Sequence, residues 1–484
     1  FALDPSLKPT FNEKRPKIIV KSLSAGDKAI LFQDDETCGS NKEVGKSQGS
    51  IGGQVEVRPS LDKALKEEGS YTYYIKVKDI AGNESACSNL SVAYNLDLTP
   101  PEAPSKIMLE DNISSIDIFK RPQVRVQGVM ANQKVKLYRD KECSIEVAEA
   151  ESIGNEVLIE MSDYKEDLPP GDLNLFAKAL SNSGNLSTCS NSGVAYTRLP
   201  FPNELSSPSS PTELFLWLDP ALSLESNIEV TGEDNEVLIL NDRSGKENHF
   251  EIADEDGFLY KSNGTGVNGK NTLYIEDQAK FRRLRSSTSK EGFKFLHDNS
   301  TNYTIALLIK PDCKNRFCAL LGNSHKFSSQ KKGFVLGFEG HSAANAGQLW
   351  FRVTNGTSSI INSKTKKGVI KKDELTLILV EFDRSKSLRP VSIYSNNILN
   401  EVPANSVRLE NKSFSSEDST HNVFLGGEPR SMKNGKCVNC YSDSKARSFK
   451  GHIGDVIIFK NLLTDDQKAD LFDFMKVKWG IVDK

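Results

Sequence analysis

The sequence predicts an all-β protein of three domains, in which two similar antiparallel sandwiches precede a larger antiparallel sandwich that ends in one helix. Three observations support this prediction. The chain has 484 residues, which is enough for two to four domains of about 150 residues each. Roughly its first 200 residues contain an internal repeat. Runs of alternating apolar and polar residues recur along the chain, whereas a helical pattern is clear only near the C-terminus.

An internal repeat divides the N-terminal part of the chain into two units of about 100 residues. Residues 81–88 (AGNESACS) return as residues 183–190 (SGNLSTCS), and Ala93-Tyr94 returns as Ala195-Tyr196, both with a shift of 102. Each unit has short strand-like runs that end at a turn containing Gly-Asn. About seven such strands in about 100 residues predict an immunoglobulin-like β-sandwich.

The cysteines predict disulfides and an oxidising compartment. Eight cysteines, an even number, in a chain that begins at Phe1 rather than Met lead us to expect an exported, processed or trimmed protein. One early and one late cysteine in each unit predict two bridges, Cys38 with Cys87 and Cys143 with Cys189. Later in the chain we expect two local disulfides rather than a crossed pair between two loops or a four-cysteine zinc site. The local pairs are Cys313 with Cys318 and Cys437 with Cys440.

The two units resemble the tandem bacterial immunoglobulin-like repeats of large surface proteins. The residues that carry the resemblance are Asp79-Ile80-Ala81-Gly82-Asn83, Ser85, Cys87 and the junction 97–104. It covers roughly residues 14–200, although the second copy has Ser181 where the first has Asp79. We therefore predict domains at residues 1–98 and 99–200, joined by a semi-rigid linker because its prolines favour extended backbone.

The rest of the chain has a different pattern. Residues 201–211, with three prolines and four serines, predict a linker. Residues 212–484 are too long for a third unit and contain strand-like runs between residues 214 and 459. One helix is expected after Thr464, which can form a capping box with Gln467. Many strands and one short closing helix predict an antiparallel jelly-roll sandwich.

This last domain resembles the laminin-G-like, concanavalin-A-like domains of bacterial surface proteins over nearly all of residues 213–484. The residues that carry the resemblance are 216–219, 240–245, 248–249, 268–273, 424–427, 451–459, 463–464 and 478–481. It implies a two-sheet sandwich that binds a glycan or a protein and sometimes holds calcium, although the fold alone does not fix function. Asp219 and Asp242 offer carboxylate oxygens in loops, so they are candidate calcium ligands, with turn capping as the alternative.

Trp350 and Arg352 are the candidate ligand-binding residues. The alternation of residues 348–353 places both on the sheet face opposite to their apolar neighbours, where a sandwich of this type commonly has its concave surface. Sugars bind to aromatic rings that have polar groups beside them. A tryptophan that only packs is the alternative. Asp455, an acid among apolar neighbours, is expected to be a hydrogen-bonded structural carboxylate.

Catalysis, nucleic-acid binding and membrane insertion are not predicted. Glu381 and Asp383 project to one face of a strand, as the paired carboxylates of a glucanase do, but the third acid of that pattern falls at Lys386. Metalloprotease, serine-hydrolase and phosphate-loop motifs are missing from the sequence. A net charge of −3 lacks the global attraction on which a non-specific nucleic-acid binder depends. No apolar run approaches the roughly 20 residues of a membrane helix.

We therefore predict a non-enzymatic, secreted or cell-surface protein with an adhesin-like role. The two immunoglobulin-like units form a stalk that presents a lectin-like domain to a glycan or protein on another surface, with calcium as the one expected cofactor. A structural subunit of a surface or envelope assembly that binds no sugar is the first alternative. A polysaccharide-degrading enzyme is the second.

Overall fold

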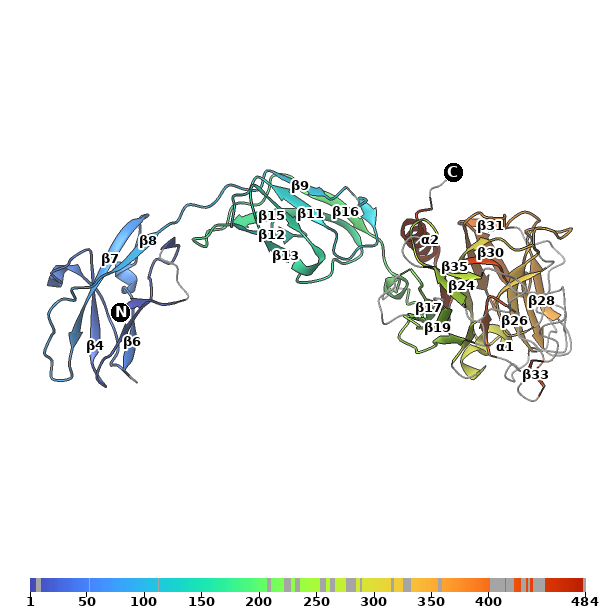
Figure 1. The fold of residues 1–484 in the computed structure, drawn as a ribbon, viewed down its shortest axis with the longest axis horizontal. Helices are drawn as coiled ribbons and strands as arrows, with labels where there is room; N and C mark the ends of the chain where they lie inside the picture. The colour runs from blue at the N-terminus through green and yellow to red at the C-terminus, as the bar shows by residue number, and fades with distance from the viewer. Residues whose placement is uncertain are drawn as a thin grey trace. The chain divides into compact units, whose positions relative to one another are not determined.

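In the structure, a computed structural model, the regular secondary structure of the described residues is mostly β-strand in largely antiparallel sheets, with one long helix near the C-terminus (Figure 1). The chain divides into two units, residues 1–198 and 199–484. The structure describes all residues except 6–9, 52, 112, 207–209, 222–227, 231–235, 253–257, 262–265, 276–283, 288–289, 315–316, 325–331, 356–358, 401–413, 415–421, 428–431, 434–435, 438–448 and 482–484.

The first unit contains two β-sandwiches with the same strand order, one in each sequence repeat. Each has a three-stranded and a five-stranded sheet, and one short parallel pair lies at the edge of the larger sheet. In the first repeat, the three-stranded sheet has the order β1 (Ala2–Leu3), β3 (Ile18–Lys21), β6 (Gln54–Val57). Its five-stranded sheet has the order β2 (Thr10–Phe11), β8 (Val92–Leu96), β7 (Gly69–Lys78), β4 (Lys28–Gln33), β5 (Glu43–Lys46). In the second repeat, the three-stranded sheet has the order β9 (Lys106–Leu109), β11 (Val124–Gln127), β14 (Glu156–Ile159). Its five-stranded sheet has the order β10 (Ile116–Asp117), β16 (Val194–Arg198), β15 (Gly171–Leu180), β12 (Lys134–Tyr138), β13 (Glu146–Glu151). The sequence repeat is therefore also a repeat of topology.

The repeated Ala-Tyr pair has the same structural role in both sandwiches. Tyr94 and Tyr196 are each 1% exposed, within the core of their own repeat. The hydroxyl of Tyr94 donates to the carbonyl oxygen of Glu13 at 2.7 Å, and the hydroxyl of Tyr196 donates to that of Phe119 at 2.6 Å. Because a buried phenol needs a hydrogen-bond partner, each tyrosine both fills the core and fixes the chain that leaves the edge strand.

A disulfide lies on the outer face of the five-stranded sheet of each repeat. It joins Cys38 to Cys87 in the first repeat and Cys143 to Cys189 in the second. In the first repeat the bridge packs with Phe32 and other apolar residues of that face, apart from the main core between the sheets. The pairs are those that the sequence predicts.

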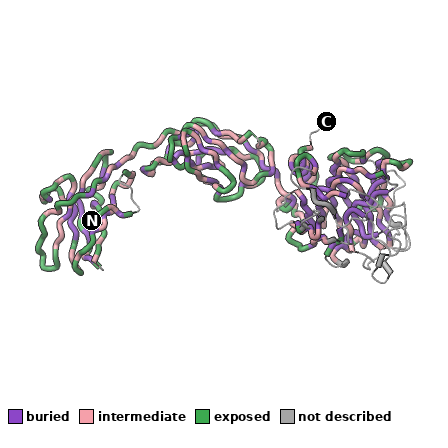
Figure 2. The backbone as a smooth tube through the Cα atoms, viewed as in Figure 1, coloured by how far each residue is buried: buried purple, intermediate pink, exposed green. Residues whose placement is uncertain are grey.

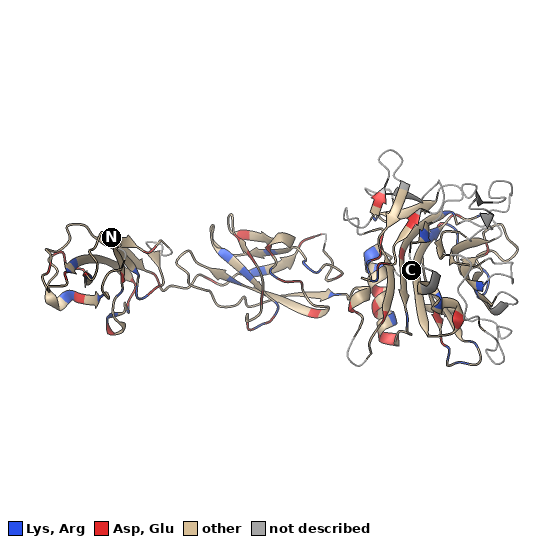
Figure 3. Cartoon of the chain, turned by 90° about the horizontal axis from the view of Figure 1, so that it is seen from below, with Lys and Arg blue, Asp and Glu red and all other residues tan. Residues whose placement is uncertain are grey.

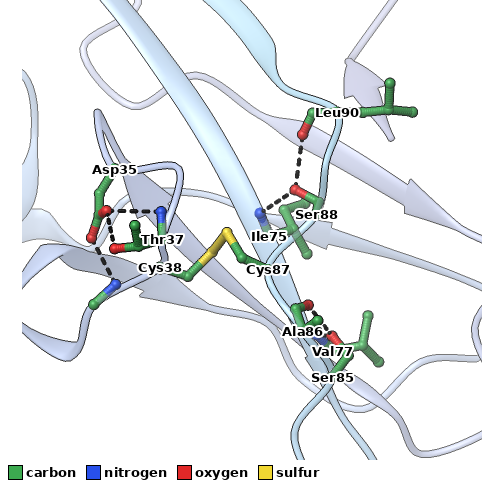
Figure 4. Close-up of a disulfide and its surroundings, with 11 residues drawn as sticks. Asp35, Thr37, Cys38, Ile75, Val77, Ser85, Ala86, Cys87, Ser88 and Leu90 are labelled. Carbon is green, nitrogen blue, oxygen red and sulfur yellow. Dashed lines mark hydrogen bonds between the residues drawn. A yellow bond between two sulfur atoms is a disulfide. The ribbon is translucent and has the colours of Figure 1, made fainter.

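The serines around Cys87 explain why the Ser-x-Cys-Ser pattern returns in the second repeat (Figure 4). Ser85 donates its backbone N–H to Val77 O at 2.9 Å, and its Oγ accepts from the N–H of the same valine at 3.0 Å. Ser88 makes the equivalent pair of bonds with Ile75. Each serine therefore satisfies both backbone groups of one residue in β7, which ties the cysteine-bearing segment to the sheet. Ser187 and Ser190 do the same with Ala179 and Ala177.

The second unit is a larger antiparallel sandwich, in which one network of paired strands surrounds a single core. One layer is ordered β31 (Ile398–Asn400), β30 (Val391–Ser395), β29 (Thr376–Phe382), β24 (Tyr303–Pro311), β35 (Gly451–Phe459), β17 (Leu214–Leu218). The other is ordered β28 (Ser359–Lys364), β27 (Leu349–Asn355), β26 (Lys332–Phe338), β25 (Cys318–Gly322), β32 (Phe424–Leu425), β23 (Leu284–Ser286), β20 (Phe250–Ile252), β19 (Glu236–Leu240), β18 (Ile228–Val230). Strands β21 (Phe258–Lys261) and β22 (Thr272–Ile275) connect β19 to β35, and β33 (Met432–Lys433) pairs with β34 (Lys436–Cys437).

Buried residues gather on the strands of the second unit (Figure 2), and period-two alternation decides which side chains enter its core. Leu307 and Ile309 of β24 and Phe351 and Val353 of β27 belong to one cluster and are at most 1% exposed. The alternate residues of both strands face away from this core. One sheet face in each layer is therefore free to pack on another element or to meet a ligand.

Helix α2 (Asp465–Trp479) covers the outer face of β24 and β35. The predicted capping box is present, since Thr464 N donates to Gln467 Oε1 at 2.9 Å and Gln467 N donates to Thr464 Oγ1 at 3.2 Å. Gly454 of β35 lets the helix approach closely, because a Cβ there would lie 2.6 Å from the ring of Trp479. The described residues include no helix with both the length and the apolar character that a membrane crossing requires.

One more α-helix and several single turns of 3-10 helix complete the described secondary structure. Helix α1 (Phe295–Asp298) is too short to be predicted from the sequence pattern. It places Phe295 and Leu296 in the core of the second unit. The 3-10 turns are Ser40–Lys42, Leu61–Lys63, Met161–Asp163, Pro202–Glu204 and Lys290–Phe293.

The described part of residues 201–211, where the sequence predicts a linker, lies within the second unit, and the domain bounds stay a prediction. The ring of Phe201 packs on those of Trp217 and Phe474, with centroids 5.9 and 5.6 Å away. The Gln467 side chain of α2 also donates to the carbonyl oxygens of Leu205 and Ser210, at 3.0 and 2.8 Å. The segment is rich in proline and serine, but its apolar side chains bind it to the helix.

Candidate functional site

Strand β27 carries Trp350 and Arg352, the two residues that the sequence nominates for ligand binding. Both are half-buried, and the neighbouring Leu349, Phe351 and Val353 point into the core. Trp350 and Arg352 therefore lie on the outer face of their layer, as the alternation predicts.

Neighbouring residues complete a surface around the indole ring. In β28, Lys364 is paired with Trp350 and Asn362 with Arg352. The Nζ atom of Lys364 lies 3.7 Å from the ring centroid of Trp350, which is a cation–π contact. The Nε1 atom of Trp350 donates to Gln348 Oε1 at 3.1 Å. We define the Trp350 face as Gln348, Trp350, Arg352, Asn362 and Lys364.

The indole ring of Trp350 is supported by apolar side chains from neighbouring strands of its own layer. It packs against a small apolar cluster of Phe317, Ala319 and Val335, and its ring centroid lies 6.1 Å from that of Phe317. Gly337, the cross-strand partner of Trp350 in β26, leaves room for this cluster, because a Cβ there would lie 2.6 Å from the Phe317 ring. The orientation of the indole is therefore set before any ligand arrives, which reduces the entropy lost on binding.

Two positive charges lie on the Trp350 face, Lys364 over the ring and Arg352 two residues along β27. Burial lowers the pKa of Lys364, and the nearby guanidinium of Arg352 lowers it further, against the opposing effect of Glu339. Two like charges on adjacent strands favour a negative or strongly hydrogen-bonding group between them. A sugar ring that displaces the Lys364 ammonium from the indole can stack there, while Arg352 and Lys364 donate hydrogen bonds to its hydroxyl or carboxylate oxygens.

Asp219, one of the two predicted calcium ligands, lies in a buried cluster of charges beneath α2. Its carboxylate is 2.6 Å from the Nζ atom of Lys478, which also lies 2.7 Å from Asp455. The indole N–H groups of Trp217 and Trp479 donate to the two oxygens of Asp455, at 3.0 and 2.6 Å. Asp455 is thus the hydrogen-bonded structural carboxylate that the sequence predicts.

Lys478 is the member of this cluster that the sequence analysis did not single out. A signal was present, because Lys478 lies on the otherwise apolar side of the helix, with Leu471, Phe474 and Met475. An acid on an apolar strand face and a base on an apolar helix face are each costly to bury alone, so their pairing is the expected solution. The sequence did not show that Asp219 is the third partner.

Asp242, the second predicted calcium ligand, organises a turn. Its Oδ1 accepts from the backbone N–H groups of Trp217 and Ser244, both at 2.9 Å. Its Oδ2 accepts from Ser244 Oγ at 2.7 Å and from Asn248 N at 3.0 Å. These contacts are those of a turn-capping carboxylate. Within the described ranges, three or more His, Cys, Asp or Glu side chains do not gather as a metal-binding group, and calcium binding by Asp219 and Asp242 stays a prediction.

Glu381 and Asp383, the carboxylates weighed for catalysis, have separate surroundings. Glu381 is 7% exposed and lies 3.4 Å from the Nζ atom of Lys468 on α2. Asp383 accepts from Ser385 N and Oγ at 3.0 and 2.6 Å. Burial opposes ionisation of Asp383, but the hydrogen bonds from Ser385 and the charge of Lys386 outweigh it and lower its pKa. A general acid requires the opposite shift.

The later cysteines are described in part. Cys313 and Cys318 form a disulfide, and both are fully buried in the core of the second unit. The expected bridge between Cys437 and Cys440 and the zinc alternative both include Cys440, which lies outside the described residues.

Comparisons with known proteins identify distant structural likenesses. No family model and no curated protein matches the sequence. The carbohydrate-binding module CBM40 of a Ruminococcus gnavus sialidase is 19% identical, with a TM-score of 0.26, over 44% of this chain and 94% of that chain. The same module bound to α2,6 sialyllactose is 20% identical, with a TM-score of 0.27, over 45% of this chain and 96% of that chain. A Trypanosoma rangeli sialidase is 10% identical, with a TM-score of 0.32, over 94% of this chain and 83% of that chain. Identities and TM-scores this low carry no argument about this chain.

Proposed function

We propose that this chain is a non-enzymatic, secreted or cell-surface protein whose second unit binds a glycan on the Trp350 face. The two repeats form the stalk that presents this surface. One observation carries the proposal, namely a half-buried indole that packs on an apolar cluster and on the ammonium group of Lys364, with Arg352 on the same face of β27. An aromatic ring packs on the C–H face of a sugar, and the side chains around it read the hydroxyl or acidic groups.

The two cations favour an acidic glycan over a neutral one. Arg352 and Lys364 lie on adjacent strands of the same face, and burial already disfavours the charged form of Lys364. A bound carboxylate or sulfate would relieve that cost, since an ion pair with a hydrogen bond is stronger than a neutral hydrogen bond. In each unit, Lys and Arg residues are interspersed with Asp and Glu residues (Figure 3), so recognition would depend on this local set rather than on net charge.

Two further observations support the non-enzymatic and extracellular parts of the proposal. The pKa of Asp383 is lowered, and Glu381 pairs with a lysine, whereas an acid and base pair in a glycosidase has one raised pKa. The three disulfides in the described part of the chain are typical of proteins that mature in an oxidising compartment. On a surface, many copies of one weak site give avidity, so tight binding by a single site is unnecessary.

The test is a glycan array probed with the full chain, with acidic and neutral glycans, in calcium and in chelator. We expect acidic glycans to bind, and Trp350→Ala to weaken binding about tenfold or more, which corresponds to about 1.4 kcal/mol. Tyr394→Ala is the matched control, because Tyr394 is also a half-buried aromatic residue of an outer face, with Lys468 Nζ 5.2 Å from its ring centroid. This control should bind like the unmodified chain.

Three results would contradict parts of this proposal. Binding to no glycan in either condition favours a structural subunit of a surface assembly. Equal loss in the Trp350→Ala and Tyr394→Ala variants removes the Trp350 face as the site. Release of reducing sugar from any polysaccharide overturns the non-enzymatic part.

A further inference from the structure

The turn after the longest strand of each repeat has different surroundings in the two copies. In the first repeat this turn, residues 79–83, is exposed throughout. In the second repeat the equivalent turn, residues 181–185, is partly covered, and Ser183 is 4% exposed. The two turns share their backbone hydrogen bonds, because Asp79 N donates to Asn83 O at 3.0 Å and Ser181 N donates to Asn185 O at 2.9 Å. One turn shape therefore serves two environments.

The second turn is covered by residues of the first repeat. Asn12 donates its backbone N–H to Ser183 O and its side-chain Nδ2 to Gly184 O, both at 2.8 Å. Asp97 accepts from Ser183 Oγ at 2.5 Å through Oδ2 and from Asn185 Nδ2 at 2.8 Å through its carbonyl oxygen. Four hydrogen bonds thus join one turn to two residues of the preceding repeat.

Asn12 and Asp97 are adjacent because of the short parallel pair in the first repeat. Phe11 of β2 lies opposite Leu96 of β8, so the residues that follow them leave the sheet side by side. The same pairing in the second repeat sets Asp117 opposite Arg198. The positions that correspond to Asn12 and Asp97 are then Ile118 and Leu199, which have no polar side-chain groups. The polar edge is therefore a property of the first repeat alone.

The side chain at position 181 explains how the turn reaches that edge. In the first repeat, the carboxylate of Asp79 accepts from both the backbone N and the Nδ2 of Asn83, at 2.8 and 2.9 Å, and so occupies the asparagine side chain. In the second repeat, Ser181 Oγ accepts only the backbone N of Asn185, at 3.0 Å. Asn185 Nδ2 is then available to bind Asp97.

The charge of Asp97 also favours a serine over an acid at position 181. Ser181 Oγ lies 2.9 Å from Ser183 Oγ, which donates to the Asp97 carboxylate. An acid at position 181 would therefore stand two hydrogen bonds from Asp97, where like charges repel. Ser181 is one of three positions at which residues 181–185 (SNSGN) differ from residues 79–83 (DIAGN), and it is the one at which an acid is lost.

We infer that residues 181–185 are a docking surface for the polar edge of the preceding repeat, formed by Asn12 and Asp97, and that Ser181 determines this specificity. The joint between the repeats is then held by direct contacts in addition to the prolines of the linker. A turn with an acid at this position, like that at residues 79–83, does not fit an edge that carries an aspartate.

Hydrogen exchange of the Asn12 amide in the full chain tests this inference, because that N–H donates to Ser183 across the joint. We expect Ser181→Asp to speed its exchange about tenfold or more, as a local opening does. The backbone amide of residue 181 in this variant should stay protected from exchange, since an aspartate supports the same turn in the first repeat. Asp79→Ser is the matched control, and it should leave the Asn12 amide unchanged.

A second variant separates charge from damage to the turn. Adding Asp97→Asn to Ser181→Asp removes one of the two like charges and keeps an oxygen that can accept from Ser183. We expect this change to slow Asn12 exchange again, although not fully, because Asn185 remains bound to residue 181. Unchanged Asn12 exchange in Ser181→Asp overturns the inference. Fast exchange that Asp97→Asn leaves as fast overturns it as well, since it would mean that the substitution only loosens the turn.

Discussion

Lys478→Met replaces the buried ammonium group between Asp219 and Asp455 with an uncharged side chain of similar length. All three side chains are at most 1% exposed, and the Nζ atom lies 2.6 and 2.7 Å from the two carboxylates. At such distances each attraction is about 6 kcal/mol for an effective dielectric constant of about 20. The cost of removing the ions from water offsets much of this gain. The cluster itself therefore adds little net stability, but losing one member of it is expensive.

We expect the variant to lose about 3–5 kcal/mol of unfolding free energy at pH 7, the range for a buried charge left without its partner. The upper end is appropriate, because one cation serves two carboxylates. Burial raises the pKa of Asp455, Lys478 lowers it and Asp219 raises it, so the substitution removes a lowering contribution. An acid whose pKa is higher in the folded than in the unfolded state loses stability as the pH rises between the two values. The deficit should therefore shrink as the pH falls from 7 toward 4.

Urea unfolding followed by tryptophan fluorescence measures this effect in the full chain. All three tryptophans, Trp217, Trp350 and Trp479, lie in the second unit, so the signal is insensitive to the repeats. Lys476→Met is the matched control on the same helix, because Lys476 is a half-buried lysine two residues before Lys478. This control should lose about 1 kcal/mol or less. A loss below about 1 kcal/mol for Lys478→Met, or a deficit that is the same at pH 4 and pH 7, would refute the reasoning.

Three further predictions concern the disulfides, the repeated tyrosines and calcium. Replacing Cys143 and Cys189 by serine should destabilise the second repeat by about 4 kcal/mol, from the entropy of a 46-residue separation, and an unchanged calorimetric transition would contradict this. Tyr196→Phe leaves a carbonyl oxygen without its 2.6 Å hydrogen bond and should cost about 1–3 kcal/mol in the same calorimetric measurement, whereas a neutral result would mean that water replaces the hydroxyl. If Asp219 and Asp242 bind calcium, adding the ion to chelator-treated protein should raise the fluorescence midpoint, and Asp242→Asn should abolish the rise. A midpoint that calcium does not move would count against the site.

Features with a local cause were predictable from the sequence. The period of two in β27 decides which side chains enter the core, so the outward position of Trp350 follows from the sequence pattern alone. The capping box at Thr464 and Gln467 needs only four consecutive residues, and the structure contains it as expected. Each repeat contains two cysteines, one early and one late, so only one pairing is possible within a repeat.

Features that depend on distant segments were not predictable in this way. Asp219 and Lys478 are separated by more than half of the chain, and only the folded sheet brings them together under α2. The neighbours of Trp350 on β28 follow from strand register, which alternation alone does not determine. Residues 201–211 show the same limit, because proline and serine content describes backbone preference, whereas Phe201 finds its place on Trp217 and Phe474 through packing.

The residues that break a local pattern are those that make the decisive distant contacts. Lys478 interrupts an apolar helix face and meets two buried acids. Ser181 replaces the acid of the first repeat and lets its turn bind Asp97. A residue that fits its local pattern is explained by that pattern, whereas one that conflicts with it needs a compensating partner elsewhere. In this chain, such conflicts are therefore a better guide to long-range structure than the motifs themselves, and Lys478→Met and Ser181→Asp test that principle in separate units.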